Sequence, residues 1–321
     1  MIAPDRIRLT GPSAHFSKPP ALKPGSTIGV AALSGSADPD RLDAGIAHLV
    51  SRGYRVVEAA NVRLRDGSRA GTDAERAAGY RALLTDPAVD AIFFARGGWG
   101  AARVLDLLDP KEAARHPKIH MGGSDLTTLF AWLHARARLA AFHGPMVAVD
   151  FAGPARDPET DASWEPVLRG ESPIRFPILS DQVVASGRAD APLVGGCLSL
   201  LVALEGTPEA LDTAGRVVFW EDVGEEIYRL DRMLTQWKRA GRFASAAGVI
   251  IGKLENIRNQ GRPDADAVSA LLDEHFGGAP YPVVRDWPSG HGRRNRTLPL
   301  GARVAIDTSR GIVSFEEPAV A

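Results

Sequence analysis

Ser124 follows two glycines in the stretch KIHMGGSDLTTLF, residues 118–130. Residues typical of a strand precede the glycines, and residues with helical spacing follow the serine. A sharp strand-to-helix turn exposes a serine to a base that can take its proton and make it a nucleophile. Leu126, however, occupies the position of the second glycine in the G-x-S-x-G hydrolase motif. The alternative is that the Ser124 hydroxyl caps the helix, and this stretch alone favours the cap.

A general base and an orienting acid are available further along the chain. Among eight histidines, His291 stands out because it lies between two glycines in an irregular segment. His143, at a predicted strand end in FHGPM, is its rival, although most single histidines have structural or surface roles. Glu221 follows the apolar run VVFW directly, so we expect it to be partly buried beside Trp220. A nucleophile, a base and an acid of these types form a catalytic triad when the fold brings them together.

The glycine-rich run RGGWG, residues 96–100, follows the apolar strand VDAIFFA. Backbone N–H groups in such a loop can bind phosphate or form half of an oxyanion hole. The run has neither the ending of a P-loop nor G-x-G-x-x-G spacing, and a tight strand-to-helix turn is the simpler interpretation.

Three arginines, Arg293, Arg294 and Arg296, follow His291 closely. They either attract a substrate carboxylate or form a solvated loop. No H-E-x-x-H motif, cysteine pair or tight His/Asp cluster is present, so the sequence predicts no metal site and no cofactor. The single cysteine, Cys197, is a possible nucleophile, but a small core residue is the better interpretation.

The elements that position these residues alternate between strands and helices. Buried strands are predicted near 27–32, 54–59, 89–95, 118–121 and 139–146, with helices between them. Thr72 and Glu75 form a capping box, and Leu126, Leu129, Phe130 and Leu133 form a helical stripe. This order predicts a parallel sheet with ligands beyond the carboxyl ends of its strands. Both RGGWG and GGSD then lie on the same edge.

The rest of the chain suggests three further segments. Residues 1–25 are polar and proline-rich and are predicted to form a loose N-terminal arm. The pattern of residues 26–150 is that of the parallel-sheet domain, and it breaks down over 151–190, which is interpreted as a linker or covering segment. Regular structure resumes over 191–321 as a smaller α/β domain with a terminal hairpin near 302–315.

Composition excludes several classes of protein. The net charge of −1 argues against a general nucleic-acid binder, and no apolar run is long enough to span a bilayer. The N-terminus lacks the apolar core of a signal peptide, and one cysteine allows no intrachain disulfide. Together these features predict a cytoplasmic protein that binds neither nucleic acid nor membrane.

Six motifs in order resemble the LD-carboxypeptidase family, serine peptidases of the murein tetrapeptide carboxypeptidase and microcin-immunity type. They are ARGGWGAARVLD, GGSDLTTL, HGPM, GGCLSLLVALEGTP, FWEDVGEEIYRLDRML and GHGRRNRTLPLG. The resemblance covers about residues 25–300. It implies a flavodoxin-like N-terminal domain carrying the serine, a C-terminal domain carrying the acid and base, and a homodimer.

The resemblance also implies roles for individual residues. Ser124 would attack the amide carbonyl, His291 would move its proton, and Glu221 would orient the imidazole. The backbone N–H groups of Gly98 and Asp125 would be the oxyanion donors. Further candidates for substrate contact are Arg96, Trp99 and His143.

Two residues depart from the family pattern. Cys197 occupies a position where asparagine is expected, and Trp99 replaces the usual tyrosine of RGGYG. The first exchange can alter the shape or polarity near the site.

The implied activity is hydrolysis of an L,D-amide bond, releasing terminal D-alanine from murein tetrapeptide, a small peptide substrate, during cell-wall recycling. One alternative is a microcin-immunity-like hydrolase of aminoacyl-nucleotide substrates, in which Trp164 stacks on a base or simply packs against the domain. Another is a non-catalytic peptide-binding α/β protein. Pocket shape decides among substrates, and sequence does not determine it.

Overall fold

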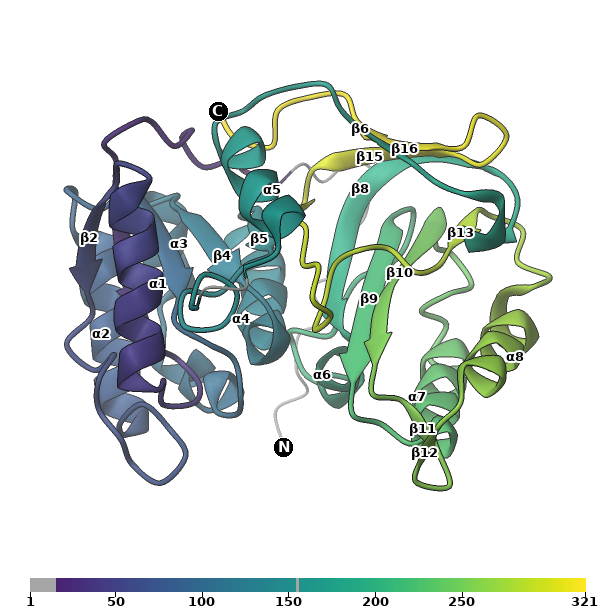
Figure 1. The fold of residues 1–321 in the computed structure, drawn as a ribbon, viewed down its shortest axis with the longest axis horizontal. Coiled ribbons are helices and arrows are strands. Elements are labelled where there is room, and N and C mark those ends of the chain that lie inside the picture. The colour runs from purple at the N-terminus through teal and green to yellow at the C-terminus, as the bar shows by residue number, and fades with distance from the viewer. Residues whose placement is uncertain (1–15, 154–155) are drawn as a thin grey trace, which may run out of the picture.

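The computed structural model describes residues 16–153 and 156–321, and Figure 1 shows two sheets side by side. The first sheet has the strand order β14-β5-β4-β3-β1-β2. Its five N-terminal strands are parallel, and β14 is antiparallel to β5. The strands are β1 (Thr27–Ala31), β2 (Arg55–Glu58), β3 (Ala91–Phe94), β4 (Ile119–Gly122), β5 (Ala141–His143) and β14 (Leu298–Leu300). The order 2-1-3-4-5 is that of flavodoxin-like sheets, as predicted.

Helices alternate with the strands of the first sheet. They are α1 (Pro39–Ser51), α2 (Asp73–Thr85), the 3₁₀ helix η1 (Ala101–Leu107), α3 (Pro110–Arg115), the 3₁₀ helix η2 (Ser124–Leu126), α4 (Thr127–Trp132) and the π-helix η3 (Leu133–Ala137). The predicted capping box is present at Thr72 and Glu75. The predicted stripe of Leu126, Leu129, Phe130 and Leu133 is fully buried. Local capping and spacing therefore identified α2 and the helical segment that follows Ser124.

The second sheet has eight strands in the order β6-β16-β15-β8-β9-β10-β13-β7. Its parallel centre is β8 (Arg188–Cys197), β9 (Val217–Val223), β10 (Gly248–Glu255) and β13 (Val283–Val284). The predicted terminal hairpin is β15 (Arg303–Asp307) with β16 (Ile312–Phe315). The sequence placed Glu221 directly after the apolar strand. In the structure β9 continues past its apolar residues, so Glu221 lies within the strand.

Three helices and a small hairpin complete this half. The helices are α6 (Leu198–Ala203), α7 (Ile227–Arg239) and α8 (Ala265–Phe276), and the hairpin is β11 (Arg258–Asn259) with β12 (Arg262–Pro263). Leu230, Leu234 and Trp237 of α7 are fully buried against the sheet, with helical spacing. The same apolar cluster contains Val218, Trp220 and Ile251 from the sheet. The alternate residues Leu193, Phe219 and Ile250 belong instead to the cluster that contains the core of the first sheet.

Residues 151–190 contain regular structure. They form α5 (Pro158–Leu168), β6 (Ile174–Pro177), the 3₁₀ helix η4 (Ser180–Gln182) and β7 (Val183–Ala185). β6 and β7 are the two edge strands of the second sheet, and α5 lies between the two halves in Figure 1. Trp164 of α5 is fully buried, with its ring 5.6 Å from that of Phe93 and 5.5 Å from that of Tyr54. It packs in the core, so stacking on a substrate base is the wrong alternative for this residue.

The predicted loose arm is packed where the structure describes it. The backbone N–H of Leu22 donates to Leu168, and Ala21 pairs with the last residue, Ala321. Leu22 itself is buried. Residues 1–15 lie outside the described residues. Throughout the described part of the chain, no helix combines the length and apolarity that crossing a membrane requires.

Candidate active site

Ser124 sits on a strained turn between β4 and the helical segment that follows. Its φ of 58° lies in the left-handed region, which costs a non-glycine residue of order 1–3 kcal/mol. A Cβ at Gly97, in the loop after β3, would lie 2.6 Å from the Ser124 Cβ and 2.8 Å from its Oγ. The absence of a side chain at Gly97 therefore leaves the space that the half-buried Ser124 hydroxyl occupies.

The helix-cap hypothesis for Ser124 is wrong. The cap position of η2 is Gly123, and no side chain donates or accepts a capping bond there. Because Ser124 has a left-handed φ, its side chain is not in the extended geometry from which a cap residue accepts an N–H. Its hydroxyl is thus free of a structural task at this helix end.

His291 and Glu221 are in direct contact. The imidazole Nδ1 lies 2.7 Å from Glu221 Oε2, and the same oxygen accepts the backbone N–H of His291 at 3.2 Å. Glu221 is fully buried and the His291 side chain is 21% exposed. Gly290 gives the carboxylate its room, since a Cβ there would lie 2.6 Å from Oε2. The second nitrogen of the ring, Nε2, is left for a reacting group.

Glu221 determines the proton affinity of His291. Burial lowers the pKa of the imidazole, but the hydrogen bond and the charge of Glu221 outweigh it, with Asp222 and Asp150 adding to the rise. The net effect is a His291 pKa above its ordinary value. A carboxylate at Nδ1 stabilises the imidazolium that forms when a base accepts a proton.

The loop that carries His291 is held by the residues around α5. Asn295 Oδ1 accepts the backbone N–H of Gly290 at 3.1 Å, and the Asn295 Nδ2 donates to Asp150 Oδ1 at 3.3 Å. The Asn295 backbone N–H donates to Thr160 Oγ1 at 2.9 Å. Burial raises the pKa of Asp150 to about 6. Asp150 lies outside the six motifs, and Asn295 lies within GHGRRNRTLPLG, but nothing in that motif indicated that its side chain bridges Gly290 and the distant Asp150.

The serine and the histidine come from different halves of the molecule. Among the described residues, Ser124 Oγ makes no hydrogen bond to the His291 ring, whereas the histidine–glutamate contact is formed. Catalytic hydrogen bonds are often long in unliganded structures and tighten in the substrate complex.

Asp125 connects the loops that surround Ser124. Its buried carboxylate accepts the Ser34 hydroxyl at 2.6 Å and the Ala101 backbone N–H at 2.8 Å. Burial raises the pKa of Asp125, although both hydrogen bonds oppose the rise. In the loop after β3, Gly98 has a φ of 112°, and Gly97 accepts the N–H of Gly35. The loops after β1, β3 and β4 are therefore tied together at one sheet edge.

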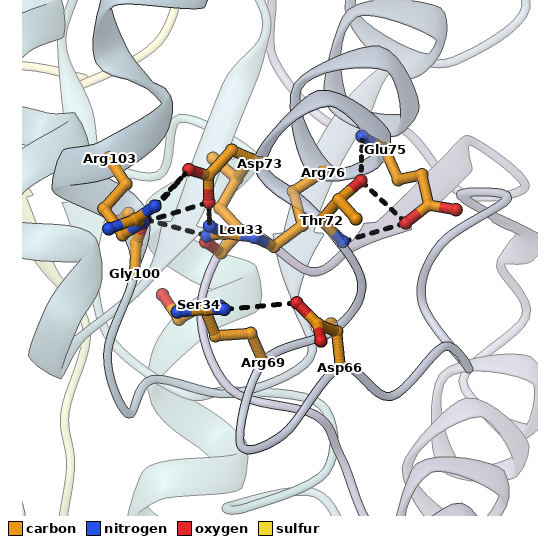
Figure 2. Close-up of polar contacts among 12 residues, drawn as sticks. Leu33, Ser34, Asp66, Arg69, Thr72, Asp73, Glu75, Arg76, Gly100 and Arg103 are labelled. Carbon is orange, nitrogen blue, oxygen red and sulfur yellow. Dashed lines mark hydrogen bonds and ion pairs between the residues drawn. The ribbon is translucent and has the colours of Figure 1, made fainter.

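Arg76 of α2 adds a second tie between two of these loops. Its side chain is fully buried and donates to the carbonyls of Leu33, after β1, and Gly100, after β3 (Figure 2). Asp73 pairs with it and also with the exposed Arg103. A buried guanidinium that bridges two loop carbonyls restrains the glycine-rich run. Nothing in the sequence indicated this role, since Arg76 looks like any polar residue on a helix.

The three further candidates for substrate contact lie in different settings. Trp99 is 54% exposed, and Arg96 is exposed with a long 3.4 Å bond to the Ser36 carbonyl. His143 is buried, with its ring 4.9 Å from Phe219, and neither ring nitrogen has a partner among the described residues. Burial, together with the charge of His291, lowers the pKa of His143 to about 3. It is neutral near pH 7, and the structure pairs Glu221 with His291 and not with this rival base.

Cys197 is buried at the start of α6. Its Sγ lies 3.3 Å from Ser199 Oγ and 3.6 Å from Asp222 Oδ1, and burial raises the pKa of the thiol well above its usual range. It does not cap α6; instead Asp222 accepts the Ser199 backbone N–H at 2.8 Å. The aspartate next to Glu221 thus supplies the helix cap that an asparagine would otherwise provide.

No group of three or more His, Cys, Asp or Glu residues positioned to bind a metal occurs in residues 16–153 and 156–321. The chemistry available at this sheet edge is that of a hydroxyl, a carboxylate-paired imidazole and backbone N–H groups.

Two family models match the two halves of the chain. The LD-carboxypeptidase N-terminal domain matches residues 28–144, and the LD-carboxypeptidase C-terminal domain matches residues 190–306. The chain belongs to the LD-carboxypeptidase family. Members of this family are serine peptidases, so the chain is a hydrolase of the carboxypeptidase type, and the resemblance drawn from six sequence motifs is confirmed.

Individual relatives extend over nearly the whole chain. A Bacillus subtilis protein described as a "probable murein peptide carboxypeptidase" is 34% identical over 300 residues, covering 93% of this chain and 94% of its own. Among solved structures, the muramoyltetrapeptide carboxypeptidase of Oxalobacter formigenes has a TM-score of 0.80 at 28% identity, covering 90% of this LD-carboxypeptidase and 97% of its own chain. MccF in complex with glutamyl sulfamoyl guanosine has a TM-score of 0.87 at 25% identity, covering 95% and 99%.

Proposed function

We propose that this LD-carboxypeptidase hydrolyses the L,D-amide bond of murein tetrapeptide and releases its terminal D-alanine, as a step of cell-wall recycling. The observation that carries the proposal is the 2.7 Å contact between His291 and the buried Glu221, in a molecule that also holds Ser124 on a strained turn. Two relatives named for murein peptides support the choice of substrate.

In the proposed mechanism Ser124 Oγ attacks the amide carbonyl carbon while His291 Nε2 takes its proton. Glu221 holds the ring through Nδ1 and stabilises the imidazolium. The backbone N–H groups of Gly98 and Asp125 are the proposed donors to the tetrahedral oxyanion. His291 then protonates the leaving amine of D-alanine, and water hydrolyses the acyl-enzyme by the same proton transfers in reverse.

Incubation of the purified protein with free tetrapeptide and with UDP-MurNAc-tetrapeptide tests the proposal. We expect D-alanine to appear, measured by mass spectrometry, together with the corresponding tripeptide. Absence of D-alanine under conditions in which another murein tetrapeptide carboxypeptidase is active would reject this function. Binding of the tetrapeptide without turnover would instead favour a non-catalytic peptide-binding protein.

A second candidate substrate is an aminoacyl-sulfamoyl nucleoside, because the fold superposes well on MccF, a microcin C7 self-immunity protein. The same serine and base would cleave it. The buried Trp164 offers no surface for stacking on the base, which favours the peptide. Parallel assays with aspartyl sulfamoyl adenosine and tetrapeptide, compared by kcat/KM, separate the two substrates.

We also propose a cytoplasmic homodimer. A single cysteine, which rules out intrachain disulfides, suits a reducing compartment. Trp99, 54% exposed beside the site, and Tyr228, 59% exposed, are large apolar side chains available for a subunit interface. Sedimentation equilibrium measures the oligomeric state, and fractionation of the source cells with an antibody measures the location.

A further inference from the structure

A cavity of about 360 Å³ adjoins the loop that carries His291. Its walls come from the start of α1, the segment after β5, the start of α5, and the two residues that follow His291 in the chain. The residues that matter for its charge are Arg41, Arg156, Arg293, Asp150 and Asp157. The loops after β1 and β5 lie at the carboxyl edge of the first sheet, which is also the edge where Ser124 follows β4.

The two carboxylates of this cavity are already used by the protein. Asp150 accepts the Met146 backbone N–H at 2.8 Å and the amide of Asn295 at 3.3 Å. Asp157 accepts the first backbone N–H groups of α5, from Glu159 at 3.1 Å and Thr160 at 2.9 Å. Both are held by donors from the fold, and neither lies within 4.0 Å of a guanidinium of the cavity in the described residues.

The three arginines of the cavity, by contrast, have no carboxylate partner within 4.0 Å among the described residues. Arg41 is held in place by Nε and Nη2 bonds to the carbonyls of Ala148 at 2.9 Å and Val149 at 3.0 Å, so its Nη1 remains available. Arg156 bonds only to the Gly153 carbonyl. Guanidinium groups that gather around a cavity without counter-ions favour an anionic ligand.

The structure also separates the arginine run of the sequence into two roles. Arg294 and Arg296 both pair with Glu159, Arg294 at 2.9 Å, and Arg294 Nε also lies 3.9 Å from Asp157 Oδ2. Arg293 does not pair with Glu159 and lines the cavity instead. Of the two interpretations of this run, the ion-paired surface loop fits Arg294 and Arg296, and the attraction of a carboxylate fits Arg293.

We propose that Arg41 and Arg293 bind a carboxylate of the peptide substrate in this cavity, beside the site of hydrolysis. The inference rests on the proposed function, because it assigns the cavity to the substrate of that reaction. A planar carboxylate can accept parallel N–H bonds from a guanidinium, which gives both affinity and orientation. The carboxylate is either the C-terminal one of D-alanine or a side-chain carboxylate of the peptide.

Binding measurements with paired acid and amide peptides test this assignment. Titration calorimetry on the Ser124→Ala protein would use synthetic murein tetrapeptide, its C-terminal carboxamide and its side-chain carboxamide. We expect Arg293→Gln, and separately Arg41→Gln, to weaken binding of the acid peptide roughly 10- to 100-fold, as for a lost charge-assisted hydrogen bond. One of the two amides will bind with unchanged affinity in the variants, and that amide identifies the carboxylate concerned.

Arg296→Gln is the matched control, since its guanidinium pairs with Glu159, belongs to the same arginine run and does not line the cavity. We expect it to leave all three affinities within twofold. The assignment is overturned if Arg41→Gln and Arg293→Gln also stay within twofold of the parent, if they weaken the acid and both amides equally, or if no peptide binds. Failure of the proposed function is seen separately, as absence of D-alanine release by the wild-type protein.

Discussion

The serine turn and the histidine–glutamate pair are built on opposite principles. The serine turn is assembled from loops of one sheet, which Asp125 and Arg76 tie together through buried side chains. The histidine–glutamate pair joins a residue of a central strand in the second sheet to an irregular loop, and that loop is held by Asn295 against residues of the other half. The proposed nucleophile is thus positioned by backbone strain and close packing, and the proposed base by hydrogen bonds across the molecule.

Ser124→Ala, a change in the serine turn, is expected to have the largest effect on activity. Removing the hydroxyl should lower kcat by about 10⁶-fold, as loss of a serine nucleophile does elsewhere. Unfolding should be unaffected, because the hydroxyl makes no capping bond and alanine keeps the same φ. Single-turnover D-alanine release and urea unfolding measure the two. If the variant keeps its activity, Ser124 is not the nucleophile.

Glu221→Gln is expected to lower kcat by about 10⁴-fold, because the amide cannot hold the imidazolium as the carboxylate does. This variant tests the histidine–glutamate pair, whose carboxylate is buried in the second sheet. Its folding is monitored by circular dichroism. Asp222→Asn is the comparison variant: it removes a charge that adds to the rise of the His291 pKa but no contact with the ring, so its loss of kcat should be much smaller.

The pH profile of the wild-type protein tests whether Glu221 controls the pKa of His291. His291 acts as a base only when neutral, and its pKa is raised by Glu221. Activity should therefore be lost as the pH falls through a value above 6.5, the ordinary imidazole value. In Glu221→Gln the acid limb of kcat/KM should move to lower pH. A limb that does not move would show that another group limits catalysis at low pH.

Gly97→Ala should perturb the serine turn without touching the histidine. The new Cβ would lie 2.6 Å from the Ser124 Cβ, so either the loop after β3 or the nucleophile must shift. A displacement of this size is expected to cost about 10²-fold in kcat. Gly278→Ala is the matched control, because no atom lies within 4 Å of a Cβ built there. Equal activities of the two variants would contradict the close packing inferred at Ser124.

Arg76→Met should have the smallest effect on rate and a clear effect on stability. It leaves the Leu33 and Gly100 carbonyls without their buried donor, which we expect to cost about 3 kcal/mol of unfolding free energy and about tenfold in kcat. Arg81→Met, on the same helix, breaks a partly exposed pair with Glu112 and should cost less than about 1 kcal/mol. Tryptophan fluorescence in urea measures both. Equal losses would mean that the burial of Arg76 has no energetic significance.

The sequence predicted those parts of the site that depend on local spacing. The alternation of strands and helices, the capping box at Thr72 and the apolar stripe after Ser124 all depend on neighbours within a few residues, whereas the flavodoxin-like strand order was implied by the family resemblance. The contact between Glu221 and His291, 70 residues apart, was anticipated only through the family resemblance. The sequence also misassigned the helix cap at Ser124, because a left-handed φ is set by tight tertiary packing that local propensity does not record.

Residues that support the site through long-range contacts left no pattern. Asp150 and Asn295 are 145 residues apart, and Arg76 reaches carbonyls 43 and 24 residues away. Each is an ordinary polar residue in its local context. Their structural roles are seen only in three dimensions, because polar groups that are buried away from water need hydrogen-bond partners.

β14 bears on the order in which the parts of the molecule are assembled during synthesis. Residues 298–300 pair with β5 and form the edge strand of the sheet that holds the nucleophile. During synthesis, His291 and β14 leave the ribosome after the five parallel strands of this sheet have been made. The first sheet of a nascent chain therefore lacks this edge strand, and Glu221 lacks its imidazole partner, until most of the second half of the molecule has been made.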